Sequence, residues 1–341
     1  MNMEFLRRLP IPQEVKAQYP PTEEDVKTRE RQIRRIERIF HGESDRFLLV
    51  IGPCSADNPD AVLSYTEKLK RLFEEVEQKI EIIPRVYTNK PRTTGEGYKG
   101  ILHQPDPEER PDLLSGIIAS RTLHLRVLHD YGFGCADEML YPENHRFLSD
   151  LLAYAAVGAR SVENQQHRLT ASGLAIPVGM KNPTGGNLRF LVNSIHAAQC
   201  RHTFLYRNWE VRTAGNPLTH AILRGYTDLS GKTVPNYDRR SLETLYGLFS
   251  EEEILNPAVI IDTNHSNTDK NCFLQAQIAK TVVQYRKDPA HRRYLKGLMI
   301  ESYLEDGSQK IGCHTFGQSI TDPCLGWEKT ERLVREIAEL L

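Results

Sequence analysis

The chain has 341 residues, of which 39% are hydrophobic and 26% are charged, and its formal net charge is −1. This composition is ordinary for a globular protein, and the near-neutral balance leaves no overall field that would attract nucleic acid or an anionic membrane surface. No apolar run approaches the roughly 20 residues that span a bilayer, and Arg7, Arg8 and Pro10 interrupt the region where a signal peptide would need an apolar core. We therefore expect a cytoplasmic protein with neither nucleic acid nor a membrane as a partner.

The first expected element is a helix that precedes every strand. Thr22 is of a type that caps helix N-termini, Ile33, Ile36 and Phe40 share one helical face, and Gly42 follows the last turn. We expect this helix to pack outside the main domain or against another subunit.

Beyond this helix, short β-rich segments alternate with amphipathic helical segments. The expected strands are residues 47–53, 80–87, 132–140, 157–163, 177–182, 202–206, 258–265 and 297–302. The expected helices are residues 61–75, 113–129, 144–154, 188–198, 242–249, 273–285 and 327–341. This alternation predicts an α/β protein with a single (β/α)8 TIM barrel, although a doubly wound open sheet gives a similar pattern. We expect an N-terminal arm and helix (1–45), a barrel (46–341) and an inserted loop or hairpin at 207–237.

Six cysteines are spread along the chain, and no two of them form a C-x-x-C pair. Because a disulfide scaffold is not expected in a cytoplasmic chain of this size, we predict reduced thiols, most of them buried. The cysteines are Cys54, Cys135, Cys200, Cys272, Cys313 and Cys324.

Charged residues fall at nearly all of the expected C-terminal strand ends, which converge on one mouth in a barrel. One such charge would be an ordinary solvated strand end, but many together are partly desolvated and need partners. The cationic members are Arg85, Lys90, Arg92, Arg160, Lys181 and Arg224. Because these cations would repel one another, and because arginine suits phosphate and carboxylate oxygens, the set predicts ligands with several negative charges, such as two phosphorylated metabolites.

A second set at the same mouth combines one sulfur, one nitrogen and two carboxylates. Its members are Cys54, His265, Glu301 and Asp322. A mixed set of this kind suits Mn, Fe, Co or Zn, although its spacing matches no zinc-finger pattern. Glu138 falls at the mouth as well, as a candidate for proton transfer or as an ordinary structural carboxylate.

Residues 95–100 (GEGYKG) match G-x-G-x-x-G literally. A dinucleotide site requires this loop directly between a strand and a helix. Here it follows residues 91–94 (PRTT) and leads into a segment without helical periodicity. We therefore expect a flexible active-site loop and no nucleotide site.

At these residues the chain resembles the type I alpha 3-deoxy-D-arabino-heptulosonate 7-phosphate (DAHP) synthases. The matching stretches are residues 51–55 (IGPCS), 85–87 (RVY), 90–94 (KPRTT), 158–160 (GAR), 177–182 (PVGMKN), 222–225 (ILRG) and 319–327 (SITDPCLGW), which run in order over most of the chain.

The resemblance implies a transferase that condenses phosphoenolpyruvate with D-erythrose 4-phosphate, the first step of the shikimate pathway of aromatic amino acid biosynthesis. It implies a divalent metal, with Mn as first choice, on Cys54, His265, Glu301 and Asp322. It implies phosphoenolpyruvate on Arg85, Lys90, Arg160, Lys181 and Arg224, and erythrose 4-phosphate on Arg92 and Thr93. Lys90, Cys54 and His265 are the expected catalytic residues, Lys90 or a metal-bound water being the candidate for proton transfer. A homodimer or homotetramer is expected.

The chain departs from the family at two internal places, and we also expect its N-terminal arm to be short compared with the family's. The family usually has a Val-Gly-Trp-Lys-Gly-like stretch where residues 95–100 appear one residue longer, and Asp-Phe-Ser where residues 262–264 read Asp-Thr-Asn. Two alternatives remain open: a Kdo 8-phosphate synthase that uses arabinose 5-phosphate, and a non-catalytic barrel that senses aromatic metabolites. The first family carries Lys-Ala-Asn-Arg-Ser where this chain has Lys-Pro-Arg-Thr.

Two further expectations concern control of activity. Residues 172–176 resemble part of an aromatic amino acid cavity of the family, and Ala175 stands where the Phe-sensitive form typically has serine, so we expect weak inhibition or none by phenylalanine. Cys324 lies two residues after Asp322. If Asp322 and Cys54 share a metal, Cys54 and Cys324 are close enough for oxidation to a disulfide; the alternative is that Cys324 merely packs its loop.

Overall fold

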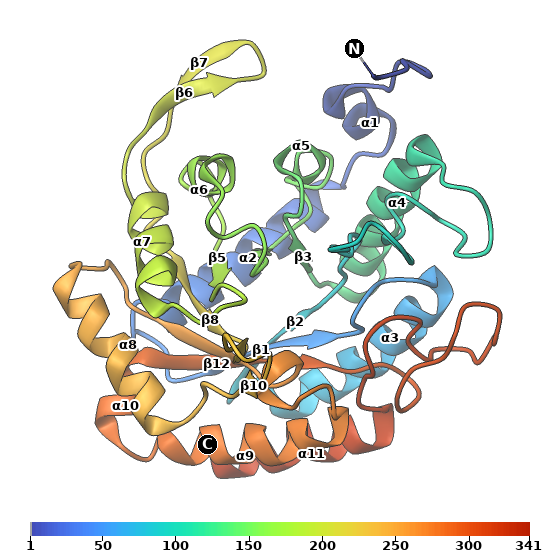
Figure 1. Ribbon diagram of the computed structural model, residues 1–341. Coiled ribbons are helices and arrows are strands. Elements are labelled where there is room, and N and C mark those ends of the chain that lie inside the picture. Colours follow the sequence, from blue (N-terminus) through green and yellow to red (C-terminus); the bar gives the residue numbers. More distant parts are fainter. Residues whose placement is uncertain (1) are drawn as a thin grey trace.

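The computed structural model describes residues 2–341 and contains a closed barrel of eight parallel strands (Figure 1). Their order is β2-β1-β12-β11-β8-β5-β4-β3, and the backbone N–H of Val86 donates to the carbonyl of Ala136 at 3.0 Å, which closes the ring between β2 and β3. The strands are β1 (Phe47–Gly52), β2 (Ile80–Pro84), β3 (Ala136–Glu138), β4 (Tyr154–Val157), β5 (Val178–Lys181), β8 (Thr219–Leu223), β11 (Val259–Asp262) and β12 (Leu295–Glu301). The predicted (β/α)8 barrel is therefore confirmed, and an open sheet is excluded.

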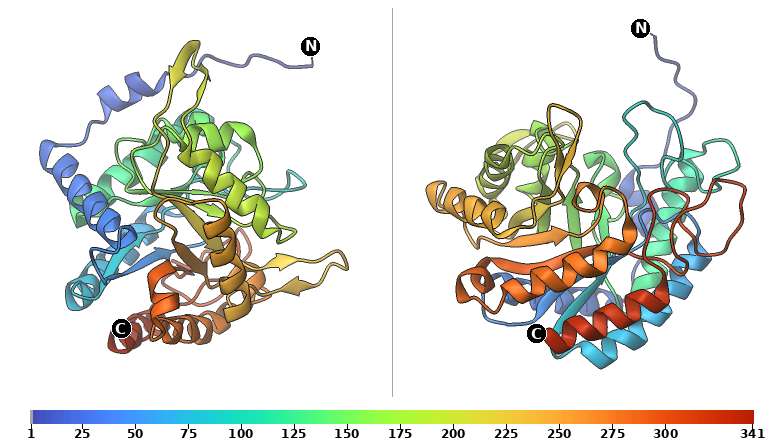
Figure 2. Two further views of the ribbon diagram at one scale, coloured as in Figure 1. Left: turned by 90° about the vertical axis from the view of Figure 1, so that its left-hand side faces the viewer. Right: turned by 60° about the horizontal axis from the view of Figure 1, so that its bottom comes forward.

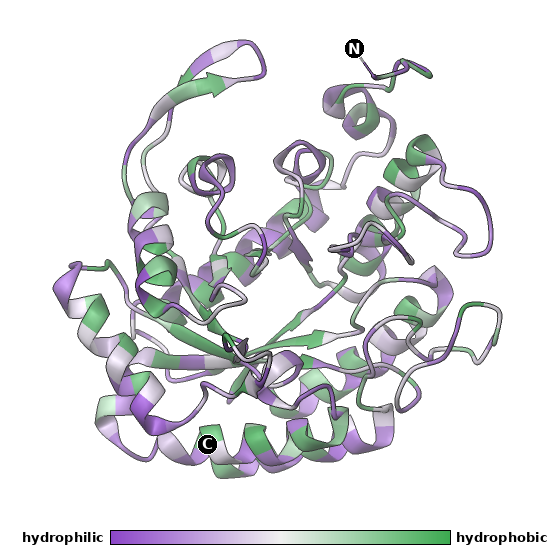
Figure 3. Cartoon of the chain, in the orientation of Figure 1, coloured by the Kyte–Doolittle hydropathy of each residue, from purple (hydrophilic) through white to green (hydrophobic). Residues whose placement is uncertain are grey.

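Every residue of these eight strands is buried, because the helices cover the outside of the barrel (Figure 3). The covering helices are α3 (Pro59–Val76), α4 (Leu113–Tyr131), α5 (Pro142–His145), α6 (Gln165–Ala171), α7 (Leu188–Gln199), α8 (Arg239–Glu251), α9 (Gln275–Tyr285), α10 (Pro289–Tyr294) and α11 (Trp327–Leu340). Side chains of Asn58, Asp112, Asn187 and Asp238 accept backbone hydrogen bonds at helix starts and so fix where those helices begin. Within residues 2–341, none of the helices has the length and apolarity needed to cross a membrane.

Two helices precede the barrel, α1 (Pro12–Gln18) and α2 (Glu23–Phe40). The prediction for α2 is confirmed: Thr22 accepts from the backbone of Asp25, and the apolar face is buried. Gln32 joins α2 to the barrel, since its amide donates to the carbonyl of Ile82 and accepts from the backbone of Gly134. Figure 1 places α2 behind the strands.

The sixth barrel strand is not where the sequence suggested. Residues 202–206 were predicted to form it, but β6 (Thr203–Tyr206) pairs antiparallel with β7 (Trp209–Arg212) in a hairpin that extends from the barrel (Figure 2). The true strand is β8, inside the predicted insertion at 207–237. Its sequence, Thr-His-Ala-Ile-Leu, contains two polar residues that are nevertheless fully buried, which hid the apolar signal. A second hairpin, β9 (Tyr226–Thr227) with β10 (Thr233–Val234), follows it.

Two other boundaries were wrong. The strand expected at 157–163 is β4, which ends at Val157, and residues 158–163 form turns before α6. The helix expected at 144–154 is only the single turn of α5, because residues after 145 form turns that lead into β4. Both segments are alanine-rich or polar and lack a clear period.

Candidate active site

The predicted charged residues converge at the C-terminal ends of the strands, around a cavity of about 330 Å³. Its lining includes Cys54, Arg85, Lys90, Arg92, Glu138, Arg160, Lys181, Arg224, His265 and Asp322. Thr93 borders the cavity, because Arg160 donates to its hydroxyl at 3.0 Å. Glu301 lies beneath the floor, fully buried, against Arg85. The structure thus brings together all residues that the sequence assigned to this mouth.

Cys54, Glu301 and Asp322 offer a sulfur and two carboxylate oxygens that all lie within 4.8 Å of one another. The fourth predicted donor, Nε2 of His265, lies 3.6 Å from Oε1 of Glu301, at the edge of this group. Sulfur, imidazole and carboxylate together are a donor set for first-row transition metals. The residues present therefore fit a metal site of that class.

Lys90 shows that this donor set attracts positive charge. Its Nζ lies 2.7 Å from Sγ of Cys54 and 2.7 Å from Oδ2 of Asp322. Burial alone would lower the pKa of Lys90, but Cys54 and Asp322 raise it above its usual range. Lys90 in turn holds the pKa of Asp322 well below its usual range, against the effect of burial. Burial, with the charge of Glu301, raises the pKa of the Cys54 thiol to about 11, so a metal ion must displace a proton to bind there.

His265 is oriented by Asp262, the last residue of β11. Its Nδ1 lies 2.9 Å from Oδ2 of Asp262, which directs Nε2 toward Glu301. The backbone of His265 has φ 54°, a left-handed conformation that non-glycine residues adopt rarely and that concentrates at functional sites. Asn264 completes the arrangement by donating to Oε2 of Glu301 at 2.6 Å.

Besides Lys90, which contacts Asp322, two more of the predicted cations are held by internal carboxylates. Arg85 donates to Glu301 at 2.7 Å, and Lys181 lies 3.1 Å from Asp262; all four side chains are buried. These pairs compensate the desolvation of each charge. Glu138 lies nearby on β3, and a Cβ at Gly158 would be 2.1 Å from Oε1 of Glu138, so a side chain there would displace this carboxylate.

The other three predicted arginines have no such partner. Arg92, Arg160 and Arg224 line the cavity, and within residues 2–341 no carboxylate lies within 4.0 Å of any of them. Burial lowers the pKa of Arg224 even though Asp262 opposes the shift, so this guanidinium is undercompensated. Cations arranged this way at a cavity create an anion-binding surface.

The sequence did not assign a role to Asp262 or Asn264, nor to Asp269 and Lys270, which also line the cavity. The only available signal was position: Asp262 and Asn264 lie in the last four residues of the strand predicted at 258–265, and Asp269 and Lys270 follow that strand. The GEGYKG stretch is a loop without helix or strand, tied back by Nε of Arg92, which donates to the carbonyl of Tyr98 at 2.8 Å. It follows no strand directly and starts no helix, so its geometry is not that of a dinucleotide site.

Comparison with known proteins gives a consistent result. A family model described as the DAHP synthetase I family matches residues 22–335. The chain is 37% identical to the Trp-sensitive phospho-2-dehydro-3-deoxyheptonate aldolase of Escherichia coli K12, over 98% of this chain and 95% of that protein. It is 36% identical to the Phe-sensitive enzyme of the same strain, over 99% and 96%. The solved structure of a phospho-2-dehydro-3-deoxyheptonate aldolase from Francisella tularensis superposes with a TM-score of 0.92 at 32% identity, covering 99% of this chain and 98% of that one. The chain belongs to the DAHP synthetase I family.

Proposed function

We propose that this protein condenses phosphoenolpyruvate with D-erythrose 4-phosphate and water to give DAHP and inorganic phosphate, as the first step of the shikimate pathway. The observation that carries this proposal is one cavity that combines a transition-metal donor set with three arginines that have no carboxylate partner in residues 2–341. Family membership supports it, and the names of the relatives describe the same activity. The reaction is that of a transferase.

The cavity contains cations paired with carboxylates and arginines without a carboxylate partner, and together they suit two anionic substrates. Phosphoenolpyruvate lies among Arg85, Lys90, Arg160, Lys181 and Arg224. The unpaired guanidiniums of Arg160 and Arg224 meet its phosphate, while the paired Arg85 and Lys181 supply fixed positive charge at the floor. Arg92 and Thr93, on the loop at the rim, hold the phosphate of erythrose 4-phosphate. Two phosphorylated molecules repel each other, and the cations offset that repulsion and align the reacting carbons.

Cys54, His265, Glu301 and Asp322 would hold a divalent ion, with Mn preferred and Fe, Co or Zn as alternatives. When bound, such an ion polarises the aldehyde oxygen of erythrose 4-phosphate or a water molecule. Asp262 keeps His265 in the neutral tautomer that can donate a lone pair from Nε2.

C3 of phosphoenolpyruvate forms a bond with the aldehyde carbon, whose oxygen takes up a proton. Water adds at C2, and phosphate leaves with cleavage of the C2–O bond, so that C2 becomes the ketone of the product. Lys90 is the proton donor, because its ammonium lies at the donor set and borders the cavity. Glu138 is the second candidate for a proton transfer, since it lines the same cavity.

The test measures consumption of phosphoenolpyruvate with erythrose 4-phosphate or with arabinose 5-phosphate, each with and without EDTA. We expect turnover with erythrose 4-phosphate only, lost in EDTA and restored by Mn²⁺. Preference for arabinose 5-phosphate would reassign the protein as a Kdo 8-phosphate synthase, and no turnover with either would support a non-catalytic barrel.

The His265→Ala variant tests the metal assignment itself. It should keep the circular dichroism and melting temperature of a folded protein while losing Mn²⁺ binding and turnover. Full activity of this variant, or of the parent in metal-free buffer, would contradict the assignment. Gel filtration with light scattering tests the proposed homodimer or homotetramer.

A further inference from the structure

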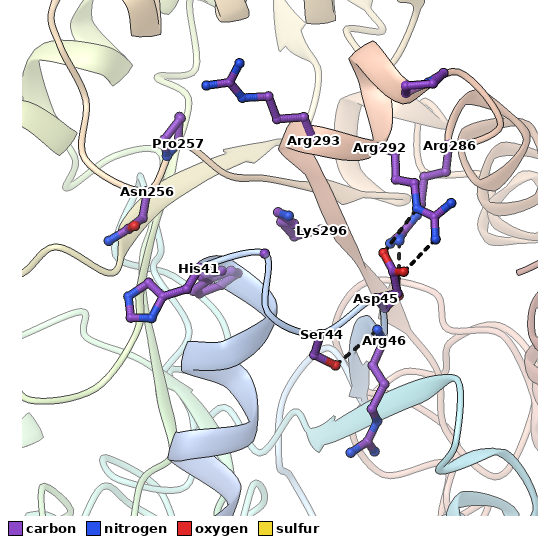
Figure 4. A pocket seen from close by; sticks show the side chains of 13 residues that line it. His41, Ser44, Asp45, Arg46, Asn256, Pro257, Arg286, Arg292, Arg293 and Lys296 are labelled. Atoms are coloured by element: carbon purple, nitrogen blue, oxygen red, sulfur yellow. Dashed lines mark hydrogen bonds and ion pairs between the residues drawn. The ribbon is translucent and has the colours of Figure 1, made fainter.

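A second cleft, of about 480 Å³, lies at the opposite end of the barrel, where the strands begin (Figure 4). Its walls come from the α2–β1 connection, from the residues before β11, from α10 and from the start of β12. A cavity of this size accommodates a metabolite-sized ligand. The proposed reaction uses none of its residues.

The lining is strongly cationic. It includes the side chains His41, Arg46, Arg286, Arg292, Arg293 and Lys296, against a single carboxylate, Asp45. Asp45 forms an ion pair with Arg292, whose Nε and Nη2 lie 3.1 and 2.7 Å from the two carboxylate oxygens. The remaining cations therefore share a cleft without a compensating charge from its own lining.

Two of these cations are buried at the cleft. Lys296 and Arg286 are each 8% exposed. Nη2 of Arg286 donates to the backbone carbonyl of Asp45 at 3.1 Å, but its buried Nη1 has no hydrogen-bond partner. Burying a guanidinium with an unsatisfied N–H costs free energy unless another group accepts a hydrogen bond from that N–H.

Lys296 is the stronger case. In residues 2–341 its ammonium has no hydrogen-bond partner and no carboxylate within 4.0 Å, and Figure 4 shows it inside the ring of lining residues without an interaction drawn to it. Burial and the neighbouring Arg286 lower the pKa of Lys296 to about 8. Burial likewise lowers the pKa of Arg286 to about 10, with Arg292 adding to the effect. Each cation thus destabilises the others.

A purely structural role explains only some of these residues. Arg46 donates to the carbonyl of Ile80 and pairs with Glu81 at 2.7 Å, so its charge is compensated within the protein, although its buried Nε has no hydrogen-bond partner. Arg286 also stacks over Phe47 at 4.8 Å. Within residues 2–341 no comparable contact accounts for the ammonium of Lys296, and the exposed guanidinium of Arg293 makes only a ring contact with its neighbour Tyr294 at 5.2 Å.

We propose that this basal cleft binds a phosphate-bearing small anion, whose oxygens accept from Lys296, Arg286 and Arg293. A phosphate dianion provides several acceptors and two negative charges; it would complete the buried guanidinium of Arg286 and offset the charge of Lys296, and the exposed Arg293 would reach it from the rim. The chemistry is shared by inorganic phosphate and by phosphomonoesters, so the test includes both. The proposal is independent of the reaction at the other end of the barrel.

The test uses the full-length protein with the active-site arginines neutralised by Arg92→Gln, Arg160→Gln and Arg224→Gln, so that phosphate binding at both proposed subsites of the mouth is suppressed. Isothermal titration with inorganic phosphate and with ribose 5-phosphate, at constant ionic strength set by NaCl, should show one remaining site. Adding Lys296→Gln and Arg293→Gln should weaken that site by at least about tenfold, as the loss of one charge-assisted hydrogen bond implies. Tighter binding of ribose 5-phosphate than of phosphate would identify a phosphomonoester as the ligand, and the reverse would identify the free ion.

A matched control is Arg332→Gln on the exposed face of α11, which removes one positive charge elsewhere and should leave binding unchanged. Lys296→Gln removes a buried charge without a partner, so its melting temperature in phosphate-free buffer should equal or exceed that of the parent. A binding loss therefore cannot be attributed to unfolding. Absence of a remaining site in the Arg92/Arg160/Arg224 background, or an affinity unaffected by the Lys296 and Arg293 changes, would overturn the proposal.

Discussion

The role of Asp262 can be tested by Asp262→Asn, which keeps the shape of the side chain and removes its charge. Asp262 is fully buried and contacts two groups at once: Lys181 at 3.1 Å and Nδ1 of His265 at 2.9 Å. The substitution leaves the ammonium of Lys181, which is 4% exposed, without a carboxylate at the floor of the cavity. It also allows His265 to adopt the other tautomer or to rotate.

Two magnitudes follow. Breaking a buried ion pair on one side costs about 3 kcal/mol at the lower end of the usual range. For 341 residues the entropy of unfolding is about 0.7 kcal/mol/K, so the melting temperature should fall by ~4 °C. Removing the group that orients a metal-binding histidine typically lowers metal affinity about 10- to 100-fold.

The measurements are calorimetric melting of the apoprotein and Mn²⁺ titration followed by electron paramagnetic resonance. Asp57→Asn is the matched control, because Asp57 is a buried carboxylate that accepts from Tyr303 and has no cation partner within 4.0 Å in residues 2–341. It should lower stability without changing metal affinity. Equal metal affinity in Asp262→Asn and the parent, or an equal loss in Asp57→Asn, would refute the reasoning.

Three other predictions concern substrate choice, regulation and oxidation. Arg92→Ala should raise the Michaelis constant for erythrose 4-phosphate at least about tenfold more than that for phosphoenolpyruvate, since one charge-assisted hydrogen bond is lost; equal effects would place Arg92 in the other subsite. Residues 172–175 border a cavity of about 580 Å³, and because Ala175 offers no hydroxyl there, millimolar phenylalanine should inhibit weakly or not at all; inhibition at micromolar concentrations would contradict this. The backbone N–H of Cys54 points at Sγ of Cys324 at 3.3 Å, so copper in air should inactivate the enzyme reversibly by a Cys54–Cys324 disulfide; Cys324→Ser should resist, and equally fast inactivation of that variant would exclude the pair. Both cysteines are at most 1% exposed, so without copper the reaction should be slow.

The sequence predicted the barrel well where strands are continuously apolar. The segments FLLVI (47–51) and VII (259–261) are buried on both faces. Short, continuous apolar runs of this kind, each followed by a helical segment, are typical of strands in a parallel sheet. β8 was missed because Thr219 and His220 break its apolar run, although both are buried. His220 is satisfied by Tyr154, whose hydroxyl lies 2.7 Å from its Nε2, a contact that depends on the closed barrel.

The site was predicted from topology more than from spacing. Strand ends that converge on one mouth bring Cys54 and Asp322 together although they are far apart in the chain, and no local pattern could have shown this. Two features of the site could not be predicted from the sequence. The role of Asp262 depends on its contacts with Lys181 on β5 and with His265 in the following 3₁₀ turn. The left-handed backbone of His265 has no sequence signature, because it is not a glycine.

Charge pairing separates two kinds of buried cation in this molecule, and the same criterion applies at both ends of β12. At its C-terminal end Glu301 neutralises Arg85, so that cation is part of the framework. Arg224, across the cavity, has no carboxylate within 4.0 Å in the described residues and is available to a ligand. At its N-terminal end Lys296 resembles Arg224 rather than Arg85, because its charge is undercompensated and it faces a cleft. In the sequence Lys296 follows Arg292 and Arg293 and looks like one more solvated cation near a helix end. It is buried only because the closed barrel brings the α2–β1 connection against the start of β12. Natural proteins lie only a few kcal/mol above unfolding, so a buried charge left without an internal partner is a cost that a bound anion would offset.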